Sequence, residues 1–424
     1  QVTLLRRPLP CHLQRAEQGG MSGVMGGTAE LTGGSAVDGS TPEYIEFDFT
    51  LMTLNVEEYA HGFDGGYLSS LAQALKEKKC NEDAVRSWFL TLRTHVFQKA
   101  AQLRAVIEAQ LPDVLCLQEH SLGLDLELLA SFGLGACLED SAFFDQSDLL
   151  AALLPAGYGH FLQGTGEAPA KFSELANVVA WKSDKFEASS QVGELITPKG
   201  KKTPSGRGTY TPRSAACVEL QPTGGSTAVV VCSTHLMGGR FEDKNWAADN
   251  EAGVNERVNQ IAAIQELVTS FAFTKGAPSV IAGDFNVMNL GFSKGPFVHS
   301  SKKYVIGDTK LYTWERLEKD YNEVYVPYQT AVHAKLEELG YAAAYGRGDD
   351  SEDMKTSRFA GCTDWIYCRG LASRRDERVV GTGATQKEGA TDHNAVIVTL
   401  NLTWEAPKKR PSGCSTVFKT WCTG

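Results

Sequence analysis

The chain has 424 residues, of which 42% are hydrophobic and 22% charged, as is ordinary for a soluble globular protein. Its formal net charge of −10 argues against a broad basic surface for long nucleic acids, but is compatible with a local basic rim and with the clustered carboxylates that bind divalent metals. No uninterrupted apolar run reaches the roughly 18 residues that span a bilayer, so we expect no transmembrane segment.

The ten cysteines are scattered without a CxxC pair, which gives zinc-ribbon and thioredoxin-like motifs no support. Cys116, Cys217 and Cys232 fall within apolar strand-like runs and are expected to be reduced core residues. This pattern favours a soluble protein in a reducing, cytoplasmic compartment. The compartment stays open, because the chain begins at Gln1 and a targeting segment could precede it.

The sequence divides into a lead-in, one large α/β domain and a tail. Residues 1–44 hold two Gly-rich patches without periodicity, which predicts a flexible segment. We expect the domain over 45–403, with insertions near 121–170 and 289–356, and a polar tail over 404–424. The second insertion follows a strand tip, where long loops commonly shape a substrate pocket. Length alone would also accommodate two average domains.

In the first half of the domain, apolar and polar residues alternate over 47–51 and predict a strand that runs on to Asn55. An amphipathic stretch predicts a helix over 94–110, ended by Pro112. The apolar run 114–117 then predicts a buried strand that leads into Glu119. A helix followed closely by a short apolar strand is typical of layered α/β folds.

The second half repeats this alternation of strands and helices. Strand-like runs occur at 177–181, 212–220, 228–232, 278–284, 362–368 and 395–400. The turn 222–225 predicts a hairpin between the second and third of these runs. Helices are expected over 254–270, packed under the sheet, and near 328–339.

Several strands end in polar residues that carry chemistry: Asn55, Glu119, His235, Asp284, Asn286, Asp364, Asp392 and His393. Each has an ordinary structural explanation: a turn cap for Asn55, a surface ion pair for Glu119, a satisfied structural histidine for His235 and a turn for Asp392. Strand ends converge in space, however, and crowded carboxylates repel one another unless a cation neutralises them.

The inventory is rich in oxygen ligands, has few histidines and lacks thiolates. It therefore suits Mg²⁺, or Mn²⁺, better than zinc. Such a cation together with histidines and carboxylates as acids and bases is the arrangement for hydrolysis of a phosphate ester.

These residues stand in motifs whose order resembles the endonuclease/exonuclease/phosphatase superfamily. The motifs are TLNV at Asn55, LCLQE at Glu119, STHL at His235, GDFN at Asp284 and Asn286, TDWIY at Asp364, and TDH ending at His393. The resemblance covers residues 45–403. It implies a DNase I-like fold, a four-layer α/β sandwich in which two mixed β-sheets pack face to face and the active site lies at one end of the sheets.

The resemblance also implies roles for these residues. Glu119 would be the principal Mg²⁺ ligand, with Asn55 and Asp392 near the metal. Asp284 would position or deprotonate the attacking water, and Asn286 would orient Asp284 or hold the phosphate. His393 would stabilise charge on the phosphoryl oxygens, with Asp364 fixing its tautomer, and His235 would contact the phosphate or assist the leaving group. Asn177 and Arg213 are looser matches to phosphate-contacting residues.

The substrate stays open among nucleic acids, nucleotides, inositol phosphates and phospholipids. The superfamily holds nucleases, phosphatases and lipid-directed enzymes of the sphingomyelinase or phosphoinositide type. Asn286-Val-Met288 and Cys362-Thr-Asp-Trp365 depart from the usual inositol 5-phosphatase motifs and weaken that assignment. A catalytically silent domain that binds phosphorylated ligands is the rival from another class. The sequence indicates no protein partner.

Overall fold

The computed structural model describes residues 43–59, 68–124, 126–131, 133–135, 144–166, 173–203, 206, 208–238, 246–287, 303–306, 310–313, 326–344, 356–357, 362–374, 376–384 and 389–406. Most of the expected lead-in, of the 289–356 insertion and of the tail therefore lies outside the described residues. The first strand begins at Tyr44 and the last ends at Glu405.

Two mixed β-sheets form the centre of the domain. The first has the order β13-β15-β1-β2-β4-β3, with β14 also paired to β15, and the second has the order β11-β12-β8-β7-β6-β5. The pairs β1/β2 and β7/β8 are parallel and the other pairs in these two sheets are antiparallel. A separate ribbon pairs β9 (Lys303–Ile306) with β10 (Lys310–Thr313).

The strands of the first sheet are β1 (Tyr44–Asn55), β2 (Val114–Ser121), β3 (Tyr158–Gly164), β4 (Leu175–Lys182), β13 (Ala372–Ser373), β14 (Arg378–Val380) and β15 (Ala395–Glu405). Those of the second are β5 (Phe186–Thr197), β6 (Arg213–Pro222), β7 (Val229–His235), β8 (Ser279–Asp284), β11 (Ala342–Ala343) and β12 (Asp364–Arg369).

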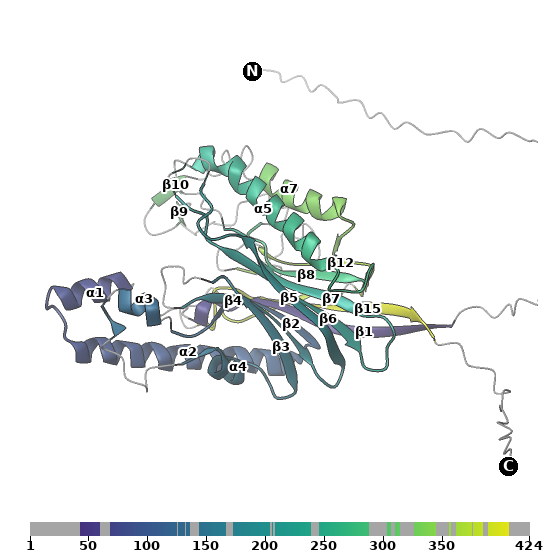
Figure 1. Ribbon diagram of the computed structural model, residues 1–424, viewed down its shortest axis with the longest axis horizontal. Coiled ribbons are helices and arrows are strands. Elements are labelled where there is room, and N and C mark those ends of the chain that lie inside the picture. Colours follow the sequence, from purple (N-terminus) through teal and green to yellow (C-terminus); the bar gives the residue numbers. More distant parts are fainter. Residues whose placement is uncertain are drawn as a thin grey trace, which may run out of the picture. The chain divides into compact units, whose positions relative to one another are not determined.

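Helices cover the outer face of each sheet. Figure 1 shows α2 (Glu82–Gln110) and α4 (Gln146–Leu153) against the first sheet, and α5 (Trp246–Val268) and α7 (Val326–Glu338) against the second. Shorter helices are η1 (Glu57–Tyr59), α1 (Leu68–Lys76) and α3 (Leu126–Ser131). The order helix, sheet, sheet, helix is the four-layer α/β sandwich expected from the sequence.

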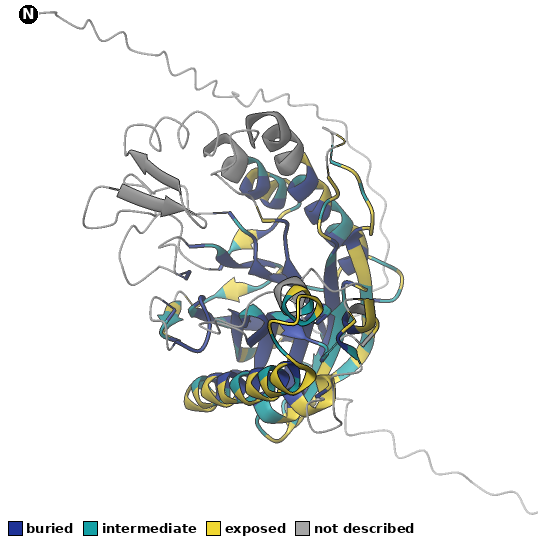
Figure 2. Ribbon diagram, turned by 90° about the vertical axis from the view of Figure 1, so that its left-hand side faces the viewer, coloured by how far each residue is buried: buried dark blue, intermediate teal, exposed yellow. Residues whose placement is uncertain are grey.

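Successive residues of the central strands pack into two different apolar cores, because the side chains of a strand alternate between its two faces. Leu51 and Cys116 point into the core between the sheets, whereas Met52 and Leu115 face α2 and α4. Buried residues accordingly line the strands, while the outward faces of the helices are exposed (Figure 2). The predicted core cysteines Cys116, Cys217 and Cys232 are buried and free. No helix in the described ranges is long and apolar enough to cross a membrane.

The helix α2 begins twelve residues before the predicted start at residue 94. Asn81 caps it by accepting a hydrogen bond from the backbone of Ala84 at 2.9 Å. Its buried stripe then runs from Val85 through Phe89 and Val96, at helical spacing, to Ile107. The helix expected from residue 254 likewise begins earlier, at Trp246.

The expectation that all of 121–170 forms a surface insertion is wrong for 158–164. These residues form β3, which pairs with β4 from Tyr158 opposite Lys182 to Gly164 opposite Ala176. Gly159 is needed here, because a Cβ at that position would lie 2.8 Å from the Trp181 ring. The long strand β5 was also not predicted, since its exposed and half-buried residues lack a strong apolar alternation.

Candidate active site

The polar strand ends meet at one edge of the two sheets. Asn55, His235 and Asp284 are the last residues of β1, β7 and β8. The antiparallel strands β12 and β15 begin at the same edge, with Asp364 as the first residue of β12 and with Asp392 and His393 just before β15. Asp284 is the register partner of both His235 and Asp364.

Asp284 lies at the centre of this group. Its Oδ2 accepts a hydrogen bond from Asn55 Nδ2 at 3.1 Å, and its Oδ1 accepts one from the backbone N–H of Asn286 at 2.9 Å. The preceding Gly283 has φ 153°, and a Cβ there would stand 1.8 Å from the carbonyl oxygen of Thr234. Only glycine lets β8 approach β7 this closely, so the Gly283-Asp284 sequence is a packing requirement.

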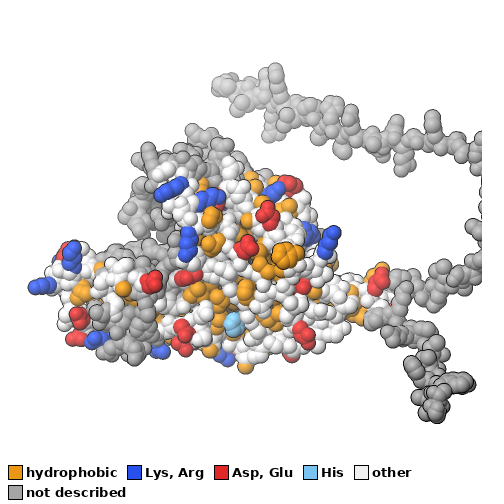
Figure 3. All heavy atoms as spheres, viewed as in Figure 1, with side chains coloured by type: hydrophobic (Ala, Val, Ile, Leu, Met, Phe, Trp, Pro, Cys, Tyr) orange, Lys and Arg blue, Asp and Glu red, His pale blue; other side chains and the backbone are white. Residues whose placement is uncertain are grey.

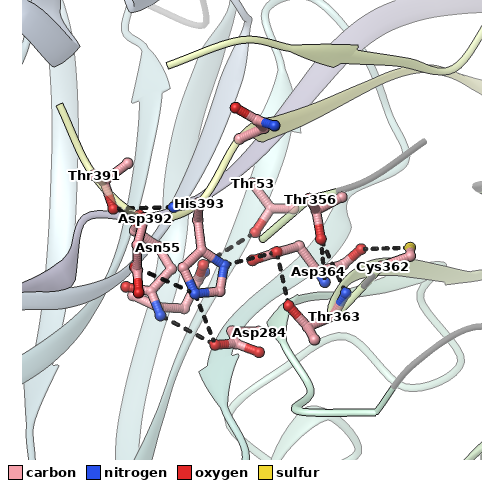
Figure 4. Close-up of polar contacts among 12 residues, drawn as sticks. Thr53, Asn55, Asp284, Thr356, Cys362, Thr363, Asp364, Thr391, Asp392 and His393 are labelled. Carbon is pink, nitrogen blue, oxygen red and sulfur yellow. Dashed lines mark hydrogen bonds and ion pairs between the residues drawn. The ribbon is translucent and has the colours of Figure 1, made fainter. Parts of the chain in front are cut away.

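His393 and Asp364 form a buried ion pair (Figure 4). His393 Nδ1 lies 2.9 Å from Asp364 Oδ2, and Nε2 lies 3.7 Å from Asp284 Oδ2 and 3.6 Å from Asp392 Oδ1. Burial alone would lower the pKa of His393, but the carboxylates of Asp364, Asp392 and Asp284 hold that pKa well above its usual value. This direction favours the protonated imidazole, in which the Nδ1–H donates to Asp364 Oδ2.

His235 has the opposite charge state. Its Nε2 lies 2.9 Å from Asn286 Nδ2, and its Nδ1 lies 3.2 Å from an Arg213 Nη1 and 3.4 Å from Glu119 Oε1. Burial, and next the neighbouring guanidinium, lower the pKa of His235 to about 4. The pKa values of the two histidines are thus shifted in opposite directions, because carboxylates surround His393 and a guanidinium lies beside His235.

Glu119 enters the site through an irregularity in β2. The register between β2 and β4 shifts between Leu117 and His120, and Glu119 has φ 55°. A left-handed conformation at a non-glycine residue costs energy and is commonly retained at functional sites. The Glu119 carboxylate lies 3.4 Å from the Asn55 side-chain nitrogen and remains partly exposed.

The site contains a carboxylate that was not predicted from the sequence, that of Glu57. Its backbone N–H donates to Asn55 Oδ1 at 2.9 Å, and its own Oε2 accepts from the backbone N–H of Asp392 at 3.1 Å. The Asn55 amide is oriented by this contact, so its nitrogen faces Glu119 and Asp284. The sequence signal was the acidic pair that begins two residues after Asn55, in Val56-Glu57-Glu58.

Arg213 and Asn177 lie at different distances from this group. The Arg213 guanidinium contacts His235 directly, and the charges of Glu119 and Asp284 act on it. Asn177 sits on β4 and donates to the backbone oxygen of Ser214 at 2.7 Å, so its contact runs to the neighbour of Arg213. Its buried Oδ1 has no hydrogen-bond partner within the described part of the chain.

The charges of this site fit a divalent cation. The carboxylates are Glu57, Glu119, Asp284, Asp364 and Asp392, against the cations Arg213 and His393. This excess of negative charge at a buried edge calls for a cation, and carboxylate oxygens select a hard one.

The atoms that cluster most tightly belong to Asp284, Asp364 and His393, within 4.8 Å of one another. In that set, however, His393 Nδ1 and Asp364 Oδ2 already bind each other. Because these two atoms are engaged with each other, Glu119 and Asp392 are the better candidates for metal ligands.

Comparisons with known proteins agree with this reading of the fold. Residues 91–393 match the family model described as the endonuclease/exonuclease/phosphatase family. A search of curated proteins gives no match.

Among solved structures, an endonuclease/exonuclease/phosphatase family protein from Bacteroides thetaiotaomicron is 13% identical, with a TM-score of 0.44 over 85% of this chain and 97% of that one. A protein of the same description from Beutenbergia cavernae is 16% identical, with a TM-score of 0.46 over 84% and 72% of the two chains. ANGEL2, described as a 2′,3′-cyclic phosphatase, is 15% identical, with a TM-score of 0.43 over 86% and 99%. Because the family model spans well over half of the sequence, the chain belongs to the endonuclease/exonuclease/phosphatase family.

Proposed function

We propose that this protein is a Mg²⁺-dependent phosphoesterase, in which water attacks the phosphorus of a phosphate ester in line with the leaving group. The observation that carries the proposal is the surroundings of His393. Asp364 holds its Nδ1 at 2.9 Å, while Nε2 points toward Asp284 and Asp392. A cation and a proton-accepting carboxylate are thereby placed side by side, which suits an anionic phosphate and a water nucleophile.

Glu119 would hold the metal, with Asn55 and Asp392 near it. Bound Mg²⁺, or Mn²⁺ in its place, would polarise a phosphoryl oxygen and neutralise charge that develops on the phosphate. The acidic excess of the site supports a divalent rather than a monovalent ion.

The protein's own groups divide the proton chemistry. Asp284 accepts the proton of the attacking water, and the Asn286 backbone and Asn55 amide fix its orientation. His393 donates from Nε2 to a phosphoryl oxygen, and Asp364 keeps the ring in the required orientation. His235, Arg213 and Asn177 hold the phosphate or the departing group. With its low pKa, His235 is neutral at pH 7 and contributes a hydrogen bond rather than a charge.

Hydrolysis of a substrate panel with Mg²⁺, and again with EDTA, tests the proposal. The panel contains single-stranded RNA, double-stranded DNA, an inositol polyphosphate, sphingomyelin and a generic phosphodiester. We expect cleavage of one class that disappears with EDTA and returns with Mg²⁺. A folded protein that binds these compounds without cleaving any would instead support a silent phosphate-binding domain.

A further inference from the structure

The connection between β5 and β6 is strongly basic in an acidic protein. From Pro198 to Arg213 the sequence contains Lys199, Lys201, Lys202, Arg207 and Arg213 and no Asp or Glu, although the whole chain carries −10. By contrast, the face of the molecule in Figure 3 intersperses basic and acidic side chains. We call the connection Pro198–Pro212 the basic hairpin.

The basic hairpin starts at the active-site edge. Its flanking residues Thr197 and Arg213 are the last register pair of β5 and β6. Arg213 contacts His235, so the hairpin extends the second sheet outward from a residue already in the site. Cations along it would therefore meet the part of a substrate that projects beyond the scissile phosphate.

The basic hairpin is held in place by backbone and side-chain contacts. Lys202 and Thr209 form an isolated antiparallel β-bridge, and the backbone N–H of Tyr210 donates to the carbonyl of Lys201 at 2.8 Å. The ammonium of Lys201 pairs with Glu256 of α5, a side chain that is only 3% exposed. Glu256 in turn accepts from Thr197 Oγ1 at 2.6 Å. This network holds the base of the basic hairpin in place. The charge of Lys201 is already paired within the protein and is not available to a substrate.

Two other lysines of the basic hairpin, Lys199 and Lys202, are available to bind a substrate. Lys199 donates to the neutral carbonyl of Gly166, two residues beyond the end of β3. Lys202 is exposed and forms no ion pair with any described residue. Lys201 is engaged with Glu256 of α5, whereas its neighbour Lys202 is exposed. The isolated bridge between Lys202 and Thr209 lies four residues along the chain from Arg213, a span of at most about 13 Å.

We propose that the basic hairpin binds a second phosphate of the substrate, through Lys199 and Lys202, while Arg213 faces the scissile phosphate. The inference rests on the proposed function and narrows its substrate class to phosphate esters that carry at least one further phosphate. It also explains how a protein of net charge −10 attracts a polyanion, because the attraction is concentrated on one short segment beside the site.

The experiment compares two chromogenic esters that differ only in charge. Both are p-nitrophenyl esters of a thymidine 5′-phosphate extended at its 3′ side by three thymidylates. One has ordinary phosphodiester linkages and the other has uncharged methylphosphonate linkages. The ratio of kcat/KM for the charged over the neutral ester is measured against ionic strength for the wild type, for Lys199→Met/Lys202→Met and for Lys275→Met. Lys275 is exposed and lies before β8, at the opposite end of that strand from Asp284.

We expect the wild type and Lys275→Met to prefer the charged ester, and the double variant to lose about fivefold of that preference, the effect of two exposed ion pairs. The slope of log(kcat/KM) against log[salt] for the charged ester should become shallower by about 1.4. Equal ratios in the wild type and the double variant would overturn the inference and leave the hydrolase assignment intact.

If the folded protein cleaves neither ester, the substrate panel with Mg²⁺ and EDTA decides the proposed function separately. The second-phosphate site is then decided by fluorescence anisotropy with the two labelled oligonucleotides. Tighter binding of the charged one, lost in the double variant, supports the site, and equal binding refutes it.

Discussion

Lys99 of α2 donates from its ammonium to the backbone carbonyl of Gly389, and its side chain is only 4% exposed. Gly389 lies three residues before Asp392, so a helix of the outer layer contacts the segment that carries Asp392 and His393. Replacing the ammonium in Lys99→Met removes this anchor at similar volume. We expect a loss of about 1–3 kcal/mol in the free energy of unfolding, measured with urea, and a lower kcat.

The matched control is Lys76→Met, at the exposed end of α1, which should change stability by less than about 0.5 kcal/mol. If Lys99→Met had the same stability and kcat as the wild type, the Gly389 loop would be held without this contact.

Glu119→Ala should remove the metal-dependent activity while leaving the fold intact. We expect hydrolysis to fall by about 100- to 1,000-fold. Mg²⁺ at about one hundred times its Kd should also stabilise the wild type by about 2.7 kcal/mol and the variant not at all. Thermal unfolding with and without Mg²⁺ measures the second effect independently of any substrate. A variant that Mg²⁺ stabilises like the wild type would remove Glu119 from the ligand set.

The charge of His393 should depend on Asp364. The wild-type pKa of His393 is well above its usual value, because nearby carboxylates outweigh the effect of burial. In Asp364→Asn a carboxylate is replaced by a neutral amide, so the pKa must fall and the imidazole must lose its proton at a lower pH. Titration of the His393 ring by NMR in metal-free protein would show this shift directly.

His393→Ala should abolish hydrolysis, and substantial residual activity in this variant would contradict the role assigned to His393.

Gly283→Ala should be far more harmful than an ordinary glycine substitution. The new Cβ would collide with the Thr234 carbonyl, at 1.8 Å, and force β7 and β8 apart. We expect a cost of about 3 kcal/mol or more and the loss of activity. Gly224 has φ +76° and nothing within 4 Å of its added Cβ, so Gly224→Ala should cost only about 1 kcal/mol. Similar urea midpoints for the two variants would contradict this packing argument.

Stability at low pH should depend on Asp113. Burial would raise its pKa, but a hydrogen bond from the Thr50 N–H and ion pairs with Lys185 and Lys182 lower it overall. A lowered folded-state pKa contributes stability above the unfolded value of about 3.9, and that contribution is lost as pH falls through the folded value. Asp113→Asn should therefore cost about 1–3 kcal/mol at pH 7 and progressively less below pH 4. Urea unfolding at pH 7 and below pH 4 measures the free energy of unfolding of the wild type and of Asp113→Asn. The same difference between the two proteins at both pH values would argue against the ion pairs.

The sequence was most informative where an apolar run of strand length ends in a polar residue that can take part in chemistry. Apolar runs ending in Asn55, Glu119, His235 and Asp284 predicted strands whose tips meet, and the structure brings these tips to one edge. The long helix was also predicted, but not its start, because the polar residues around Val85 and Phe89 mask a stripe that becomes visible only against the core.

Contacts between distant segments could not be predicted from such patterns. Lys99 and Gly389 are 290 residues apart, and nothing in the amphipathic repeat of α2 singles out one lysine as an inward-facing anchor. The Glu57 contact with Asp392 depends in the same way on how β1 and β15 pair. The edge strand β3 was missed because its half-buried residues give little apolar alternation.

The last residues of β7 and β8, His235 and Asp284, are register partners in a parallel pair, and each is followed by a connection that leaves the sheet. The backbone position of both residues is therefore set by the strand pair, and Asn286, two residues beyond β8, contacts both side chains. A connection that begins beyond the paired strand ends can change in length or sequence without moving the backbone of either residue. If the proposed function holds, substrate preference could therefore change while the two side chains keep their places.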